Sequence, residues 1–173
     1  MTTRIRPATP TEYPHLGTLV ADTYLTEGYL DFGPDDPYLP VLKDVAARAA
    51  HAEILVAEAP DGLTDLPDGI AGTVTFVPRG ATPMADIATG DEAEIRMLAV
   101  APKARGHGIG EALVRACVTR AAGAHRIVLS TQSEMHAAHR LYERLGFVRT
   151  PHRDWSPVPH LDDLTLLTYE LTL

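Results

Sequence analysis

The chain has 173 residues, 45% of them hydrophobic and 22% charged, and its 23 acidic and 15 basic side chains give a formal net charge of −8. This length and apolar fraction predict a single domain spanning residues 1–173, and they exclude a disordered chain. The acidic balance disfavours general binding to nucleic acid or to an anionic membrane, and no apolar run is long enough to span a bilayer.

The N-terminal third of the chain predicts one strand and two helices. Residues 4–7 have the pattern of a short strand, and Thr9, Pro10 and Glu12 form the signature of a capped helix start. After a loop rich in Gly, Pro and Asp, residues 39–49 predict a second amphipathic helix. No apolar signal-peptide core precedes the first strand, so we expect a cytoplasmic protein.

The middle of the chain predicts a β-hairpin and one further strand. Residues 54–58 and 70–77 are apolar segments joined by a turn that contains two Asp-Gly pairs. Gly72 interrupts the second of these segments, which indicates a bulge or a close approach of another backbone. After a polar loop, residues 93–100 predict a strand that leads directly into a glycine-rich turn.

The C-terminal third alternates helices and strands. The helix after the glycine-rich turn carries Cys117, the only cysteine, on its apolar face, so we expect this thiol to pack in the core. Residues 126–130 predict a strand, 134–145 a helix, and two further strands begin at Phe147 and cover 164–173. The last strand is rich in leucine and is expected to be an exposed sheet edge, which would favour a homodimer. This order predicts a mixed α/β domain with helices on both faces of a sheet.

The turn before the third predicted helix is the strongest functional signal. Arg105, Gly106, Gly108 and Gly110 stand where a strand ends and a helix begins, and Lys103 adds a second cation. Glycines allow successive backbone N–H groups to converge, and the helix N-terminus adds a partial positive charge. We therefore expect a bound anion at this turn, and a pyrophosphate would fit.

Two common phosphate-binding loops do not match this turn. The nucleoside-triphosphatase loop ends in Gly-Lys-Ser/Thr, whereas Gly110 is followed by Glu111. The dinucleotide-binding pattern G-x-G-x-x-G/A fails in both possible frames, which makes a nicotinamide or flavin oxidoreductase the weakest functional reading. The pattern that does match is R-x-x-G-x-G, formed by Arg105, Gly108 and Gly110.

This pattern resembles the acetyl-CoA loop of the GNAT N-acetyltransferase superfamily, and two further segments strengthen the resemblance. Residues 94–100 resemble the family's fourth strand, and Leu141, Tyr142, Gly146 and Phe147 form its L-Y-x-x-x-G-F signature. The resemblance implies an α/β GNAT acyl-CoA N-acyltransferase fold, with a mixed, mostly antiparallel sheet and helices on both faces. It also implies acetyl-CoA as the acyl donor.

The resemblance further implies roles for particular residues. Backbone groups of Leu98, Ala99 and Val100 would pair with the pantetheine arm of acetyl-CoA. Tyr142 would protonate the departing thiolate, and Glu94 would act as a general base. The pyrophosphate would be held by the backbone N–H groups of six consecutive residues, namely Arg105, Gly106, His107, Gly108, Ile109 and Gly110.

The residues themselves leave other readings open. Glu94, Arg96 and Leu98 share strand parity, which predicts that Glu94 faces the same side as part of the strand that would pair with the cofactor. Glu94 could instead serve only as a partner of Arg96 or of a neighbouring strand. Tyr142 lies on the apolar face of its helix and could be a core aromatic residue. Many relatives carry an asparagine seven residues before this tyrosine, where the present chain has Met135.

Two classes of function fit the sequence. The first is an acetyl-CoA-dependent N-acetyltransferase, in which a primary amine attacks the thioester directly within a ternary complex. The second is a catalytically silent acyl-CoA-binding sensor or regulatory module, which would need the glycine-rich turn but neither Tyr142 nor Glu94.

The acceptor would be the amine of a small molecule or of a peptide. Asp31, Asp35 and Asp36, in the loop before the second predicted helix, favour a cationic amine. No metal site is expected, because His136 and His139 lie three residues apart without an H-E-x-x-H motif or a further ligand.

Overall fold

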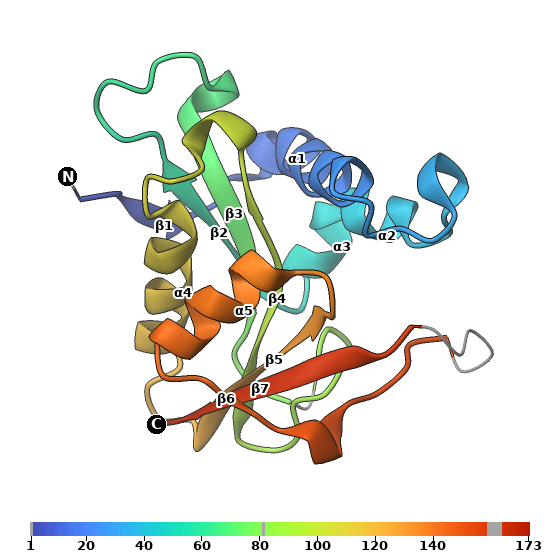
Figure 1. The fold of residues 1–173 in the computed structure, drawn as a ribbon. Coiled ribbons are helices and arrows are strands. Elements are labelled where there is room, and N and C mark those ends of the chain that lie inside the picture. The colour runs from blue at the N-terminus through green and yellow to red at the C-terminus, as the bar shows by residue number, and fades with distance from the viewer. Residues whose placement is uncertain (1, 81, 159–163) are drawn as a thin grey trace.

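The computed structural model describes residues 2–80, 82–158 and 164–173. Its centre is a seven-stranded sheet with the order β1-β2-β3-β4-β5-β7-β6, in which β4 and β5 are parallel and the other neighbouring pairs are antiparallel (Figure 1). The strands are β1 (Ile5–Pro7), β2 (Glu53–Glu58), β3 (Ile70–Val77), β4 (Glu92–Val100), β5 (Arg126–Gln132), β6 (Val148–Arg149) and β7 (Leu166–Thr172). The predicted mixed, mostly antiparallel sheet is confirmed.

Helices cover both faces of this sheet, as the element order predicts. They are α1 (Tyr13–Thr26), α2 (Leu39–Lys43), α3 (Val45–Ala49), α4 (Ile109–Arg120) and α5 (His136–Arg144). On one face, Val20 of α1 and Leu42 of α2 pack against the second half of β4. On the other face, Leu113 of α4 and Tyr142 of α5 join the largest buried cluster, which includes Phe76 of β3. The two apolar faces of the sheet are therefore buried separately.

The single helix predicted over residues 39–49 is wrong. The chain forms two short helices, α2 and α3, which are separated by Asp44 at φ −85° and ψ 72°. The Asp44 carboxylate accepts the Ala47 N–H at 3.0 Å, so Asp44 starts a new helix instead of continuing the first one. Arg48 of α3 is buried and donates to two carbonyl oxygens at the end of α2, each at 2.9 Å. These two hydrogen bonds connect α3 to the end of α2 across the break at Asp44.

Two local predictions are confirmed. Glu12 accepts the Thr9 N–H at 2.8 Å, which is the expected helix-start bond. Gly72 marks a close approach, because a Cβ atom there would lie 2.9 Å from the carbonyl oxygen of Ala99 and 3.0 Å from Cγ2 of Ile109. The absence of a side chain at Gly72 therefore lets α4 and β4 pack tightly against β3.

The expectation that the last strand is an exposed sheet edge is wrong. β7 pairs with β5 on one side and with β6 on the other, and Tyr169 near its centre is 2% exposed. Among the strands that the structure describes, the edges are β1 and β6, which are three and two residues long. The argument for a homodimer from an exposed leucine-rich edge therefore no longer applies.

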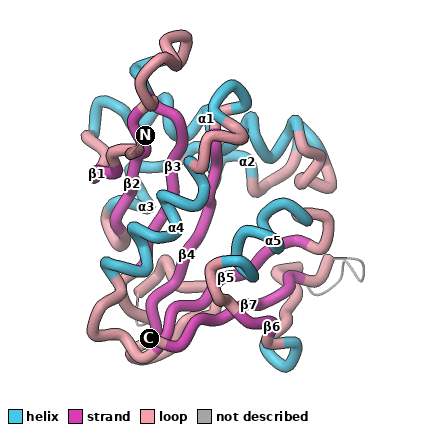
Figure 2. The backbone as a smooth tube through the Cα atoms, turned by 60° about the vertical axis from the view of Figure 1, so that its left-hand side comes forward, coloured by secondary structure: helices cyan, strands magenta, loops and turns pink. Residues whose placement is uncertain are grey.

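The middle of β4 contains an irregularity that opens the sheet. Where β3 advances by two residues, β4 advances by three, and Met97 adopts a φ of +52°. This extra residue is a β-bulge, which bends a strand and increases its twist. The parallel pairing with β5 reaches only as far as Ile95 and Leu129, and beyond that point the two strands diverge (Figure 2). The opening between them is where the candidate site lies.

Candidate active site

A cavity of about 550 Å³ lies where β4 and β5 diverge, and residues of α4, α5 and the end of α1 line it. Most of the predicted site residues line this cavity, namely Leu98, Ala99, Val100, Arg105, Gly106, Gly108, Ile109, Gly110 and Tyr142. His107 and Glu94 are not among the lining residues. The structure thus brings the glycine-rich turn, the second half of β4 and the predicted acid into one site.

The turn before α4 has a row of unpaired backbone donors. Gly106 and Gly108 have φ angles of +79° and +74°, in the left-handed region that glycine adopts readily. In the part of the chain that the structure describes, the N–H groups of residues 106–111 donate to no backbone carbonyl, and the first helical bond of α4 runs from Ala112 to Gly108. Free N–H groups at a helix N-terminus bind anions, so this turn fits a pyrophosphate group.

Unlike the backbone N–H groups of the turn, its charged and polar side chains already have partners within the protein. His107 Nδ1 lies 3.0 Å from the carbonyl oxygen of Arg105, which places the ring against the turn itself. Arg105 Nη1 donates to Glu27 Oε1 at 2.6 Å, across 78 positions of sequence, and Lys103 lies 3.9 Å from the carboxylate of Asp65. Glu27 lines the cavity but has no local sequence signal, because only the fold brings the end of α1 to this turn.

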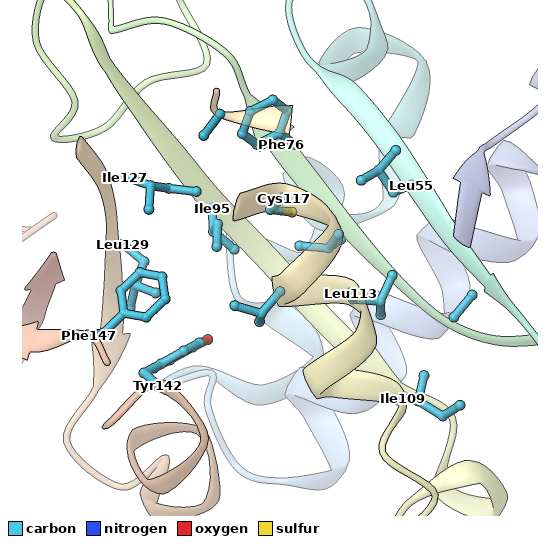
Figure 3. Packing of buried hydrophobic residues seen from close by; sticks show 14 of the residues in the cluster. Leu55, Phe76, Ile95, Ile109, Leu113, Cys117, Ile127, Leu129, Tyr142 and Phe147 are labelled. Atoms are coloured by element: carbon cyan, nitrogen blue, oxygen red, sulfur yellow. The ribbon is translucent and has the colours of Figure 1, made fainter. Parts of the chain in front are cut away.

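Tyr142 is both a core residue and a wall of the cavity. Its ring is 6% exposed and packs 5.8 Å from the ring of Phe147 and 6.0 Å from that of Tyr169, measured between centroids. In Figure 3 its hydroxyl points away from Phe147, toward the helix that carries Leu113 and Cys117. Burial raises the pKa of Tyr142 well above the ordinary tyrosine value, so the hydroxyl keeps its proton at neutral pH.

The prediction that Glu94 and Leu98 face the same side of β4 is wrong. The bulge at Met97 inserts one residue into β4, and an inserted residue reverses the alternation of side chains beyond it. Ile95 and Leu98 consequently pack together on the α4 side of the sheet. Glu94, which precedes Ile95, points to the face that α1 and α2 cover.

The carboxylate of Glu94 anchors the loop between β3 and β4. Its Oε2 accepts the N–H groups of Asp86, Ile87 and Ala88 at 3.0, 3.1 and 3.0 Å. Burial raises the pKa of Glu94 to about 7, although the backbone hydrogen bonds act in the opposite direction. Oε1 accepts no hydrogen bond from the residues that the structure describes. Glu94 thus combines one saturated oxygen, one free oxygen and a pKa close to neutral pH.

A charged and aromatic cluster that the sequence did not predict lies on the same face of the sheet as Glu94. Arg96 forms an ion pair with Asp86 at 2.8 Å, and its guanidinium lies 3.4 Å from the Tyr38 hydroxyl. Tyr24 packs edge-on against Tyr38, with a centroid distance of 6.4 Å. Arg96 and Tyr24 line the cavity. The cluster therefore borders the part of the cavity that is farther along β4 from the glycine-rich turn.

Local hydrogen bonds fix several other residues around the cavity. Asp36 accepts two N–H groups of its own loop, at 2.9 and 3.2 Å, so its carboxylate stabilises the loop. Trp155 donates to Ser130 at 2.9 Å, and Ser130 lines the cavity. Met135 lines the cavity where many relatives have asparagine, and its sulfur lies 3.5 Å from the Thr131 hydroxyl.

Neither a metal-binding cluster nor a membrane-spanning helix occurs among the residues that the structure describes. Over residues 2–80, 82–158 and 164–173, no group of three or more His, Cys, Asp or Glu side chains is placed to hold a metal ion. His139 Nε2 instead lies 2.9 Å from the carbonyl oxygen of Gln132. None of the helices described is both long enough and apolar enough to cross a membrane. Cys117 is buried, as expected, and burial raises its pKa to about 12.

The family assignment agrees with this geometry. The profile of the Acetyltransferase (GNAT) family matches residues 21–147, a span that contains the glycine-rich turn, β4 and Tyr142. The chain belongs to the GNAT acetyltransferase family. It is an N-acetyltransferase, and acetyl-CoA is its acyl donor. The search of curated proteins returned no match.

Solved structures share the fold over almost the whole chain. A GCN5-related N-acetyltransferase from Kribbella flavida is 21% identical, with a TM-score of 0.70 and coverage of 99% of this chain and 98% of that one. A GNAT-family acetyltransferase from Staphylococcus aureus Mu50 is 15% identical, with a TM-score of 0.72 and 99% of each chain covered. The putative acetyltransferase yncA from Salmonella typhimurium, solved with its cofactor acetyl-CoA, is 20% identical, with a TM-score of 0.68 and coverage of 100% and 95%.

Proposed function

We propose that the enzyme transfers the acetyl group to a primary amine by direct attack on the thioester, within a ternary complex. The observation that carries this proposal is the shape of the cavity, which connects the free N–H groups of the glycine-rich turn with the Tyr142 side chain. Acetyl-CoA supplies the acetyl group in activated form, as a thioester. The roles of the protein are then to hold this donor, to orient the amine and to move two protons.

The holding groups are mainly backbone atoms. The N–H groups of residues 106–110, at the N-terminus of α4, would hold the pyrophosphate, with Arg105 beside them. β4 no longer pairs with β5 beyond Ile95, so the backbone of residues 98–100 can pair with an extended pantetheine arm. His107 contributes through its backbone only, because its ring is bonded to the turn.

Tyr142 is the proposed acid. When the bond between the acetyl carbon and sulfur breaks, the departing thiolate takes up a proton. A phenol whose pKa is raised by burial retains this proton until then, and Tyr142 lines the cavity in which the thioester would lie. The same burial makes ionised Tyr142 unfavourable, so the phenol must recover a proton before the next turnover.

Glu94 is the proposed base. An amine is mostly protonated at pH 7 and attacks only in its neutral form, so a group with a pKa near 7 is suited to accept its proton. Glu94 does not line the cavity, so the proton would travel to its free Oε1 through a water molecule. The Arg96–Asp86 ion pair and the tyrosines beside it would contact the acceptor.

A thiol-release assay with acetyl-CoA and a panel of primary amines tests the proposal. The panel should include small alkylamines, aminoglycosides and peptides with free N-termini, because the acceptor is the least defined part of the site. Amine-dependent release of coenzyme A, with mass spectrometry of the acetylated product, is the expected result. Single-turnover mixing should show no acetylated protein, because direct attack forms no acyl-enzyme. An acetylated side chain that appears and decays at the turnover rate would contradict the mechanism.

A further inference from the structure

The ion pair between Arg105 and Glu27 lies at the mouth of the cofactor cavity. The two side chains meet at 2.6 Å and are 46% and 34% exposed. Both residues line the cavity, although Glu27 comes from the end of α1 and Arg105 from the turn before α4. The cation next to the proposed pyrophosphate site thus already has an anionic partner from within the protein.

Neighbouring contacts hold Glu27 in place. It is the C-cap residue directly after α1, and its backbone N–H donates to the Thr23 carbonyl oxygen at 3.0 Å. Two residues later, the Tyr29 carbonyl accepts a hydrogen bond from the Gln132 side chain of β5, at 3.0 Å. Because the backbone on both sides is fixed, the carboxylate loses less conformational freedom when it meets Arg105 than a carboxylate on a free loop would.

We infer that Glu27 competes with the cofactor's phosphate groups for Arg105 and thereby lowers the affinity of the enzyme for coenzyme A and its thioesters. This inference rests on the proposed function, because it takes the glycine-rich turn as the pyrophosphate site. When Arg105 is bound to Glu27, its guanidinium is not available to the phosphates, which then depend mainly on the backbone N–H groups of the turn. The apparent dissociation constant rises as the fraction of time that Arg105 is free of Glu27 falls, in inverse proportion to that fraction.

The competition between Glu27 and the phosphate groups for Arg105 also helps the product, coenzyme A, to dissociate. Coenzyme A keeps its phosphates after the acetyl group has been transferred, so the turn holds product as firmly as it holds the donor. A carboxylate that recaptures Arg105 weakens that hold without touching the reacting atoms. Glu27 is therefore an affinity-setting residue that acts through Arg105, not a catalytic residue.

The effect of Glu27 on the affinity for coenzyme A is limited, because the side chains of Glu27 and Arg105 are both partly exposed. Ion pairs between partly exposed side chains contribute about 0.2–1 kcal/mol, which corresponds to about a 1.4- to fivefold change in an equilibrium constant. The expected gain for Glu27→Gln is thus about 1.4- to fivefold in the affinity for coenzyme A. Salt screens both the ion pair and the phosphate contact, so the gain should shrink between about 0.02 M and about 0.3 M salt.

Isothermal titration calorimetry of the full-length protein tests the inference. The two ligands are coenzyme A and pantetheine, which has no phosphate. Glu27→Gln should bind coenzyme A more tightly and bind pantetheine like the wild type. Glu53→Gln is the matched control, because Glu53 also pairs with one arginine, Arg120 at 3.2 Å, but does not line the cavity. It should change neither affinity.

A second pair of variants separates competition for Arg105 from a general effect of negative charge. In an Arg105→Gln background, Glu27→Gln should have no further effect on coenzyme A binding. A gain of the same size in that background would overturn the inference, as would unchanged or weaker binding of coenzyme A by Glu27→Gln alone. Failure of the wild type to bind coenzyme A at all would overturn the proposed function instead.

Discussion

The two ends of the cavity are constructed in different ways. The cofactor end is formed by one continuous segment, the end of β4 and the turn at residues 101–110, and its donors are backbone N–H groups. The acceptor end is formed by side chains from α1, the α1–α2 loop, the β3–β4 loop and β4, including Tyr24, Tyr38, Asp86 and Arg96. Backbone donors depend on local conformation, whereas the acceptor end depends on how distant segments pack.

This difference explains why the donor of the reaction is better defined than the acceptor. A short motif sets the backbone geometry of the glycine-rich turn, and any chain with that motif places N–H groups in the same way. At the acceptor end, the Arg96–Tyr38 contact joins residues 58 positions apart, and the ion pair with Asp86 crosses from β4 to a loop. Substitutions at the two ends should therefore alter different kinetic constants.

The largest expected effect is at Glu94, on the acceptor side. Glu94→Gln removes the basic group and keeps the shape, so turnover near neutral pH should fall by about 100- to 10,000-fold, the usual range for a general base. The affinity for acetyl-CoA should stay within about twofold, and activity should partly return at high pH, where the amine is already neutral. Steady-state kinetics over pH 6 to 10 would show this. If the variant turns over as fast as the wild type, Glu94 is not the general base and serves only to anchor the loop between β3 and β4.

The next largest effect is expected at Tyr142, which lines the same cavity. Tyr142→Phe should slow single-turnover acetyl transfer by about 10- to 1,000-fold, because a thiolate leaves with less need of an acid than a poorer leaving group does. The ring would keep its packing, so the free energy of unfolding should change by only about 1 kcal/mol.

Tyr169→Phe is the matched control for this variant. Tyr169 belongs to the same aromatic cluster and donates to Glu143 at 2.9 Å, but it does not line the cavity. It should lose a similar amount of stability, about 1 kcal/mol, and no chemical rate. If the two variants have the same single-turnover rate of acetyl transfer, Tyr142 is a packing residue and not the acid.

A third effect concerns stability and its dependence on pH. The folded-state pKa of Glu94 is raised to about 7 from an ordinary value of 4.5, so the folded protein favours protonated Glu94. Its contribution to stability is fully present below pH 4.5 and is lost as the pH rises through 7. Relative to Glu94→Gln, the wild type should lose up to about 3 kcal/mol of unfolding free energy over this interval.

Glu92, two residues earlier on β4, provides a control of opposite sign. Burial tends to raise its pKa, but hydrogen bonds from Arg153 and Thr89 outweigh burial and lower the pKa to about 2. Its contribution to stability is present above pH 4.5 and is lost as the pH falls toward 2. Denaturant unfolding of the wild type and both glutamine variants, from pH 3 to 8, should give differences with opposite slopes. Parallel curves would refute the burial effect at Glu94.

The smallest effect is expected at the glycine-rich turn, where many donors share one ligand. Gly108→Leu and Gly123→Leu both place a side chain at a positive φ, +74° and +94°, with no heavy atom within 4 Å of the new Cβ. Each should cost about 1–2 kcal/mol of stability. Only Gly108 lines the cavity, so only Gly108→Leu should weaken coenzyme A binding, by about 10- to 100-fold, as one charged hydrogen bond is lost. Equal affinities in the two variants would place the phosphate elsewhere.

The sequence by itself determined the features that depend on local backbone conformation. The capped start before α1, the hairpin of β2 and β3, the close approach at Gly72 and the glycine-rich turn were each predicted from one continuous stretch of the sequence. The family motifs around Arg105 and Tyr142 belong to the same group. These features are legible because short segments with Gly, Pro or capping residues have few conformations open to them.

The tertiary structure decided what depends on one inserted residue or on distant partners. The bulge at Met97 reversed the side-chain alternation of β4 beyond it and so placed Glu94 and Leu98 on opposite faces, and Asp44 divided one predicted helix into two. The pairing of β7 on both sides and the contact of Glu27 with Arg105 join segments far apart in the chain. Periodicity and spacing describe a strand or helix only up to its next irregularity. Contacts between distant segments are selected by the packing of the whole sheet and its helices, so no short stretch of sequence contains them.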